Sequence, residues 1–177
     1  MTPNRSRLRG ARKWLLTAHV VASVGLLGAV SSSLLLALMA TTDDAEFAHS
    51  SYRLISTQAA VFGIPLSFIS LFTGIALGRA TKWGVVTYRW TTAKLALQLL
   101  VILNGALVLG PTVAARLDGE GSEWGLVAAM SASVAMLLAA VFLSVFKPGG
   151  RLRRSPRGTP DRRQPPAPAA PNPTAWR

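Results

Sequence analysis

Residues 14–40 read WLLTAHVVASVGLLGAVSSSLLLALMA, and this stretch decides the class of fold. It carries no formal charge, and 19 of its 27 residues are Ala, Val, Ile, Leu, Met, Phe, Trp or Tyr. A bilayer core of roughly 30 Å needs about 20 helical residues to cross it. Because backbone groups in lipid must form their hydrogen bonds within the segment, the stretch predicts a membrane-spanning helix.

Three further stretches, at residues 54–78, 95–115 and 125–146, contain no Asp, Glu, Lys or Arg and are also long enough to cross a bilayer. The sequence therefore predicts an all-α fold, a four-helix transmembrane bundle within residues 14–146. The short connections favour an up-down-up-down order of the spans. The lipid bilayer is the first partner that this fold implies.

The second helix is predicted to begin before its apolar stretch, near residue 43. Thr41 followed three residues later by Asp44 fits a capping box, and acidic residues stabilise a helix N-terminus. The helix would then run to about Arg79. This leaves a very short turn after the first helix, so helices one and two should form an antiparallel hairpin.

A cleaved signal peptide is the alternative interpretation of the first stretch, because residues 1–13 carry five Lys and Arg. An apolar region of 27 residues is longer than the roughly 7–15 residues of a signal-peptide core. Leu38 also fits poorly three positions before a cut after Ala40. Both features favour a first helix that is retained in the protein.

The distribution of charge predicts the orientation. The 177 residues contain 19 Lys and Arg against 7 Asp and Glu, a net charge of +12. Of the cations, 17 lie in residues 1–13, 79–94 and 147–177, whereas the other two loops carry Arg53 and Arg116 alone. The positive-inside rule places the 17 cations in the cytoplasm. We expect a multi-pass protein of the plasma membrane with both termini in the cytoplasm.

The composition also excludes several classes of protein. A chain without Cys is neither a disulfide scaffold nor a Cys-based zinc module, and four apolar spans exclude a soluble single-domain enzyme. No basic stretch is interleaved with stacking aromatic residues, so we expect no nucleic-acid binding. The charge instead suits membrane orientation and attraction to anionic lipid.

Residues 147–177 form a separate region that holds 8 of the 11 prolines and 8 Lys and Arg. This composition predicts a disordered, basic, Pro-rich cytoplasmic tail. The alternative is a docking tail for a proline-reading domain or for lipid headgroups. Residues 1–13 are predicted to be a basic cytoplasmic segment.

Small residues recur at helical spacing in the first, second and fourth spans. In the first span they are Ala18, Ala22, Gly25, Ala29 and Ser32, and in the second they are Gly63, Ser67, Ser70, Gly74 and Gly78. Such faces let helices approach closely in lipid, which predicts a compact bundle with little internal volume. Pro65 and Pro111 interrupt the second and third spans, and each is a predicted helix kink because proline removes a backbone donor.

His19, Lys94 and Gln98 are the candidate intramembrane polar cluster. His19 and Lys94 should each lie about 7.5 Å inside the cytoplasmic ends of their helices, and Gln98 lies one turn beyond Lys94. Lys94 can instead extend its amine to the headgroups, and His19 can be a hydrogen-bonded packing residue. In the functional interpretation, His19 binds a haem or a metal and Lys94 and Gln98 bind an acidic group.

No catalytic residues are predicted. The spans contain no Asp or Glu, and Ser31-Ser32-Ser33 has no acidic partner in its helix. His49, the other histidine, belongs to the outer side near Asp43, Asp44 and Glu46. We interpret that group as a solvated helix face, and predict no metal site there.

Two motifs carry a family resemblance: Trp14-Leu-Leu-Thr-Ala-His19-Val-Val-Ala-Ser-Val-Gly25 in the first span and Ala93-Lys94-Leu-Ala-Leu97 at the start of the third. They resemble an uncharacterised actinobacterial family of predicted integral membrane proteins. More distantly, the chain is similar to the copper-resistance protein D membrane domain and to the haem-binding membrane protoporphyrinogen oxidase. That last resemblance implies haem binding at His19 and a functional Lys94.

Three functions remain open from the sequence. The first is a non-enzymatic membrane scaffold or partner subunit, working as a homo-oligomer or with a membrane partner. The second is a haem- or metal-binding redox protein that uses His19 and Lys94. The third is a transporter of a small solute or ion. The absence of carboxylates from the spans and of a second histidine within them favours the first.

Overall fold

The computed structural model describes residues 5–42, 44–80 and 89–146. Every regular element in these ranges is a helix, in the order α1 (Arg5–Met39), α2 (Ala45–Gln58), η1 (Ala59–Gly63), α3 (Ile64–Ala80), α4 (Arg89–Asn104), η2 (Gly105–Leu109), α5 (Gly110–Leu117) and α6 (Glu123–Phe146). The tail predicted for residues 147–177 lies outside the described residues.

Four helical segments are long and apolar enough to cross a membrane: Gly10–Met39, Ala45–Ala80, Arg89–Leu117 and Glu123–Phe146. The second combines α2, η1 and α3, and the third combines α4, η2 and α5. The prediction of a helical chain with four such spans is confirmed for the described ranges. The helices are longer than the apolar stretches and include charged residues at their ends, such as Arg79, Arg89 and Glu123.

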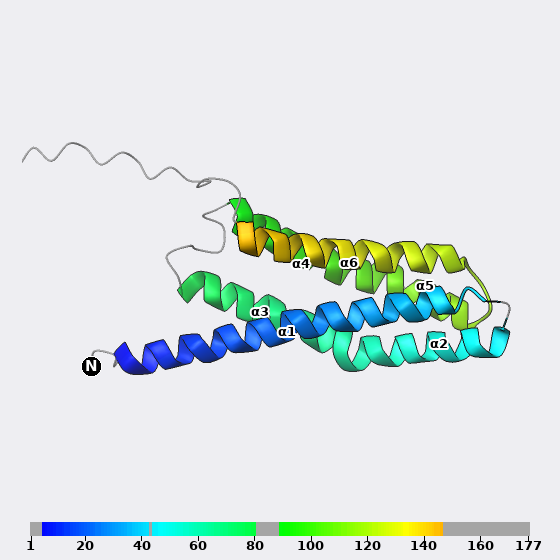
Figure 1. The fold of residues 1–177 in the computed structure, drawn as a ribbon, viewed down its shortest axis with the longest axis horizontal. Coiled ribbons are helices and arrows are strands. Elements are labelled where there is room, and N and C mark those ends of the chain that lie inside the picture. The colour runs from blue at the N-terminus through cyan, green and yellow to red at the C-terminus, as the bar shows by residue number, and fades with distance from the viewer. Residues whose placement is uncertain (1–4, 43, 81–88, 147–177) are drawn as a thin grey trace, which may run out of the picture.

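The helices form two antiparallel pairs (Figure 1). Beside α1 runs the α2–α3 rod, with His19 next to Ser70 and, further along α1, Ser33 next to Gln58. In the other pair, α6 runs beside the α4–α5 rod. The main contact between the pairs is α1 against α6, whereas α3 and α4 touch little. We call the end with residues 40–45 and 117–123 the loop end, and the opposite end the N-terminal end.

The predicted capping box at Thr41 is wrong, because Asp44 is the N-cap of α2. Its backbone is extended, with φ −83° and ψ 98°, and its carboxylate accepts from the N–H groups of Glu46 at 3.1 Å and Phe47 at 3.0 Å. Thr41 lies two residues beyond the end of α1, and its hydroxyl donates to the Leu38 carbonyl in the last turn of that helix at 2.8 Å. The helix therefore begins at Ala45, close to the start expected near residue 43.

A π-helical turn precedes each membrane proline. Pro65 follows η1 and Pro111 follows η2, and the last N–H of each turn, from Ile64 or Gly110, donates to the carbonyl five residues back. Proline has no N–H and crowds the preceding turn, so a wider turn accommodates it. The predicted kinks at Pro65 and Pro111 therefore fall next to irregular turns of the helix.

Arg116 holds the α5–α6 connection at the loop end. Its guanidinium donates to Glu123 Oε1 at 2.8 Å and to the Gly121 carbonyl at 3.0 Å, and it lies 5.2 Å from the centroid of the Tyr52 ring. Gly119, with φ 81°, and Gly121, with φ 82°, take left-handed conformations in this turn. Arg116 thereby ties the turn to α2, where Tyr52 is only 2% exposed.

The expectation of little internal volume is wrong. Glycines do bring α1 and α3 together, since a Cβ on Gly25 would lie 3.2 Å from Leu66 Cδ1. However, α4 has no stripe of small residues and approaches α3 only slightly. The two pairs separate toward the N-terminal end, and a cavity of about 490 Å³ lies between them. Close packing within one pair therefore does not close the space between the pairs.

Candidate functional site

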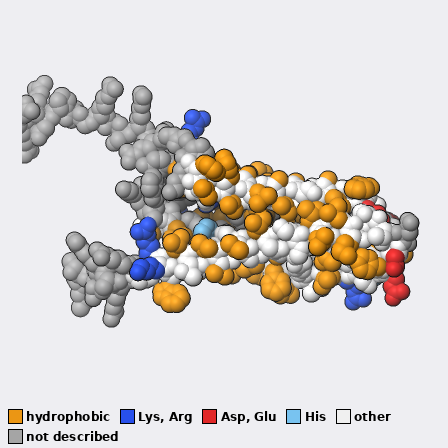
Figure 2. Space-filling view, viewed as in Figure 1, with side chains coloured by type: hydrophobic (Ala, Val, Ile, Leu, Met, Phe, Trp, Pro, Cys, Tyr) orange, Lys and Arg blue, Asp and Glu red, His pale blue; other side chains and the backbone are white. Residues whose placement is uncertain are grey.

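The cavity lies between the α1–α3 and α4–α6 pairs in the half of the bundle nearer the N-terminal end. The cavity is partly open to the outside of the protein, and Figure 2 shows a hollow between the two pairs. Most of its lining is apolar. The exceptions that carry polar side-chain atoms are Arg12, His19, Ser23, Ser70, Trp90, Thr91, Lys94, Gln98 and Ser144.

His19 is held at the cavity wall by α3. Its Nδ1 lies 3.1 Å from the Ser70 carbonyl oxygen and 3.1 Å from Thr73 Oγ1. A carbonyl can only accept, so these partners assign the proton of a neutral imidazole to Nδ1. The Thr73 hydroxyl in turn donates to the Ile69 carbonyl at 2.5 Å. The other ring nitrogen, Nε2, is then an acceptor, and no described residue hydrogen-bonds to it.

Gly74 makes the position of the His19 ring possible. A Cβ built on Gly74 would lie 3.1 Å from His19 Cε1 and 3.5 Å from Nδ1. The first of these distances is tighter than an ordinary contact, so the ring rests directly on the α3 backbone. Ser23, one helical turn beyond His19, pairs with the Ser70 hydroxyl at 2.9 Å. Together these contacts fix α1 against α3 beside the cavity.

Lys94 enters the cavity from α4, and its Nζ donates to Ser144 Oγ on α6. No Asp or Glu lines the cavity among the residues that the structure describes. The ion pair found in these ranges, Arg116 with Glu123, lies at the opposite end of the bundle. The ammonium of Lys94 is therefore partly buried beside a neutral hydroxyl and has no acidic partner in the described chain.

Gln98 completes the predicted cluster. Its amide Nε2 donates to the Ser67 carbonyl at 3.3 Å, across the gap between α4 and α3. The structure thus places His19, Lys94 and Gln98 around one cavity, each hydrogen-bonded to a neighbouring helix. Asn104, deeper in the same span, is not among the residues that line this cavity, and it donates to the Ala129 carbonyl at 2.9 Å and to Ser133 Oγ at 2.8 Å.

Neither histidine belongs to a group of side chains that could form a metal site in the described part of the chain. Within residues 5–42, 44–80 and 89–146, no group of three or more His, Cys, Asp or Glu side chains could hold an ion. His49 is exposed on α2 at the loop end. A haem could take one histidine ligand from the described residues that line the cavity, His19 Nε2. The Nδ1 of this ring is hydrogen-bonded to the Ser70 carbonyl, an arrangement found in many metal-binding histidines.

Several lining residues were not predicted from the sequence. Ser70 and Gly74 were recognised, but only as members of a stripe of small residues. Ser144 and Trp90 were not singled out as site residues, since a lone serine or tryptophan near a span end is common. The spacing of Ser70 and Gly74 from the end of α3 could have placed them level with His19, given the antiparallel hairpin.

The four long apolar helices are compatible with a multi-pass integral membrane protein. Comparison with protein-family models, curated proteins and solved structures finds no match for this chain. The resemblance to the membrane families described above therefore stays a prediction.

Proposed function

We propose that this protein is a non-enzymatic, multi-pass protein of the plasma membrane that binds a small, largely apolar ligand in the cavity between its helix pairs. The observation that carries the proposal is the cavity itself. A volume of about 490 Å³ lies in the range of small-molecule sites, roughly 300–1,000 Å³. Its apolar lining with a few polar groups is also typical of such sites.

The hydrogen bonds around the cavity favour binding over catalysis. A serine nucleophile needs an adjacent general base such as histidine or lysine. His19 Nδ1 bonds the backbone of Ser70 and not its hydroxyl, and Lys94 donates to Ser144 Oγ as an ammonium, which has no lone pair to take a proton. The Ser70 hydroxyl is paired with Ser23. The described lining also contains no carboxylate that could act as a general acid or base. We infer a partner subunit or carrier that holds its ligand without changing it.

The bilayer is the proposed source of the ligand. Large apolar side chains cover the outward faces of the helices, among them Val21 and Phe72, each of which is 63% exposed. Such faces are suited to contact with lipid. A partly open cavity in the same half of the bundle can then be reached sideways, from the membrane, without a path through water.

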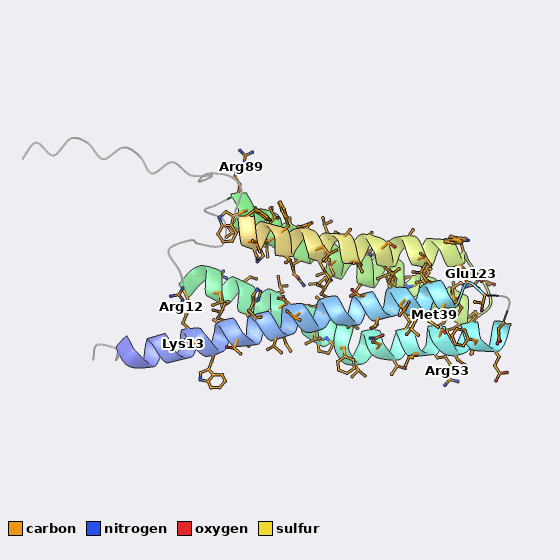
Figure 3. All side chains as sticks on the ribbon, viewed as in Figure 1. Arg12, Lys13, Met39, Arg53, Arg89 and Glu123 are labelled. Carbon is orange, nitrogen blue, oxygen red and sulfur yellow. The ribbon has the colours of Figure 1, made fainter. Side chains whose placement is uncertain are left out.

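The orientation we propose has both termini in the cytoplasm. Arg12, Lys13 and Arg89 lie at the N-terminal end, whereas Arg53 and Glu123 lie at the loop end (Figure 3). Because cations mark the cytoplasmic side, this separation along the bundle supports the charge argument from the sequence.

A reporter fused after Arg177 tests this orientation. Green fluorescent protein should fluoresce there, and alkaline phosphatase should be inactive, because the first folds in the cytoplasm and the second requires export. The same reporters inserted after Gly119, in the α5–α6 turn, should give the reverse pattern. Active phosphatase at Arg177 would overturn the proposed orientation.

Ligand binding is tested with hexadecanol, an uncharged single-chain probe, by native mass spectrometry of the detergent-purified protein. We expect saturable binding of one molecule per chain. Ala140→Trp, which fills the cavity, should weaken binding about tenfold or more, because the probe and the indole compete for one space. The control is Ala139→Trp, on the exposed face one residue away, which should bind as the wild type does.

Two outcomes would contradict apolar ligand binding in the cavity. One is the absence of saturable binding. The other is equal binding by both tryptophan variants. A visible haem band in the purified protein that disappears in His19→Ala would instead support the redox alternative, in which His19 Nε2 is the axial ligand.

A further inference from the structure

The charges around the cavity do not balance. Lys94 and Arg12 both line it, and no acidic side chain does so among the described residues. The Ser144 hydroxyl accepts one hydrogen bond from the Lys94 ammonium, which has three donors. An ionised group within a membrane span is costly unless a partner or water compensates it. A partly buried cation with a neutral partner is therefore suited to an anion that the ligand brings.

The charged lining residues lie toward the N-terminal end of the cavity, and its deepest part is apolar. Arg12 and Trp90 lie nearest the N-terminal end, and His19 and Lys94 follow about one or two turns further in. Leu26 and Leu137 lie deepest, in an apolar cluster near the middle of the span. From His19, which is level with the ionic head, to Leu27, the lining along α1 extends about 12 Å at 1.5 Å per residue. A ligand with an ionic head and a long apolar chain matches both parts.

His19 adds a second contact for an acidic head. Because Nδ1 carries the ring proton and donates to the Ser70 carbonyl, Nε2 is an acceptor on a ring that lines the same cavity as Lys94. A carboxylate offers only an acceptor for Lys94, whereas a phosphate monoester monoanion has both features that this pair can bind. Its anionic oxygen can accept from Lys94, and its O–H, where protonated, can donate to His19 Nε2.

We propose that the ligand is an acidic single-chain amphiphile drawn from the bilayer, whose phosphate or carboxylate head binds Lys94 while its chain occupies the apolar end of the cavity. The inference rests on the proposed function and names the chemical class of its ligand. Gln98, one turn beyond Lys94, donates to the Ser67 carbonyl and so links α4 to α3 beside the head site.

The test compares hexadecyl phosphate with hexadecanol on the wild-type protein, since the two probes share a chain and differ in charge. Hexadecyl phosphate should bind at least about tenfold tighter, the gain expected of one charge-assisted contact. In Lys94→Met the ratio of the two affinities should fall to about one, and Lys94→Arg should retain a preference for the phosphate. Lys13→Met is the matched control, because Lys13 is exposed at the same end and does not line the cavity.

Each outcome decides a different point. Equal binding of the two probes to the wild type would overturn the acidic-ligand inference and leave the proposed function standing, and this comparison needs no variant to fold. A preference that survives in Lys94→Met would also overturn the inference. Displacement of hexadecyl phosphate by millimolar inorganic phosphate would identify a free-anion site in place of a lipid site. Absence of binding by both probes would overturn the proposed function itself.

Discussion

Replacing Gly74 by leucine is expected to remove ligand binding from the cavity. A Cβ at this position already lies 3.1 Å from His19 Cε1, so the branched end of a leucine would need the space that the imidazole occupies. The ring would be displaced from the Ser70 carbonyl into the cavity. Filling the site and moving one of its walls should together lower the affinity for hexadecanol by about 100-fold, measured by native mass spectrometry.

Gly28→Leu is the matched control for this variant. Gly28 is exposed on α1, and a Cβ there meets no atom within 4 Å, so the same exchange adds a leucine to a lipid-facing surface. It should bind hexadecanol as the wild type does. Gly74→Ala should fall between the two, because the ring has to move only a few tenths of an ångström. Wild-type binding by Gly74→Leu would show that the ligand does not use this cavity.

The second large effect is expected from Arg116→Ala, which should lower the free energy of unfolding by about 2 kcal/mol. The exchange removes the ion pair with Glu123, the hydrogen bond to Gly121 and the contact with the Tyr52 ring. The side chain of Arg116 is 15% exposed and that of Glu123 is 36% exposed. The loss should therefore be smaller than for a fully buried pair, since water screens the carboxylate.

The measurement is reversible unfolding of the purified protein in mixed micelles, followed by circular dichroism. Arg53→Ala is the control, because Arg53 is exposed at the same end of the bundle and should change the stability by less than about 0.5 kcal/mol. Glu123→Gln should lower the free energy of unfolding by less than Arg116→Ala does, since it leaves the hydrogen bond from Arg116 to the Gly121 carbonyl in place. Equal stability of Arg116→Ala and Arg53→Ala would mean that Arg116 does not hold the turn.

The four membrane spans could be predicted from the sequence because the requirement for them is local. Lipid cannot hydrogen-bond to a backbone, so an uncharged apolar stretch of about 20 residues must become helical whatever it packs against. The same local reasoning singled out His19, Lys94 and Gln98, since polar side chains are rare in such stretches. Local reasoning chose the wrong N-cap for α2, Thr41 in place of Asp44, because the choice between the two depends on where α1 ends.

The sequence by itself thus determined the number of apolar spans and the polar residues within them. Only the tertiary structure decided what those residues face. His19 meets Ser70 across 51 positions of the chain, and Lys94 meets Ser144 across 50. These pairings depend on how each helix is rotated and how closely its neighbours approach. The cavity exists because α1 and α3 pack closely through Gly25 and Gly74 while α4 stays apart from α3, a balance among three helices that no single stretch of sequence contains.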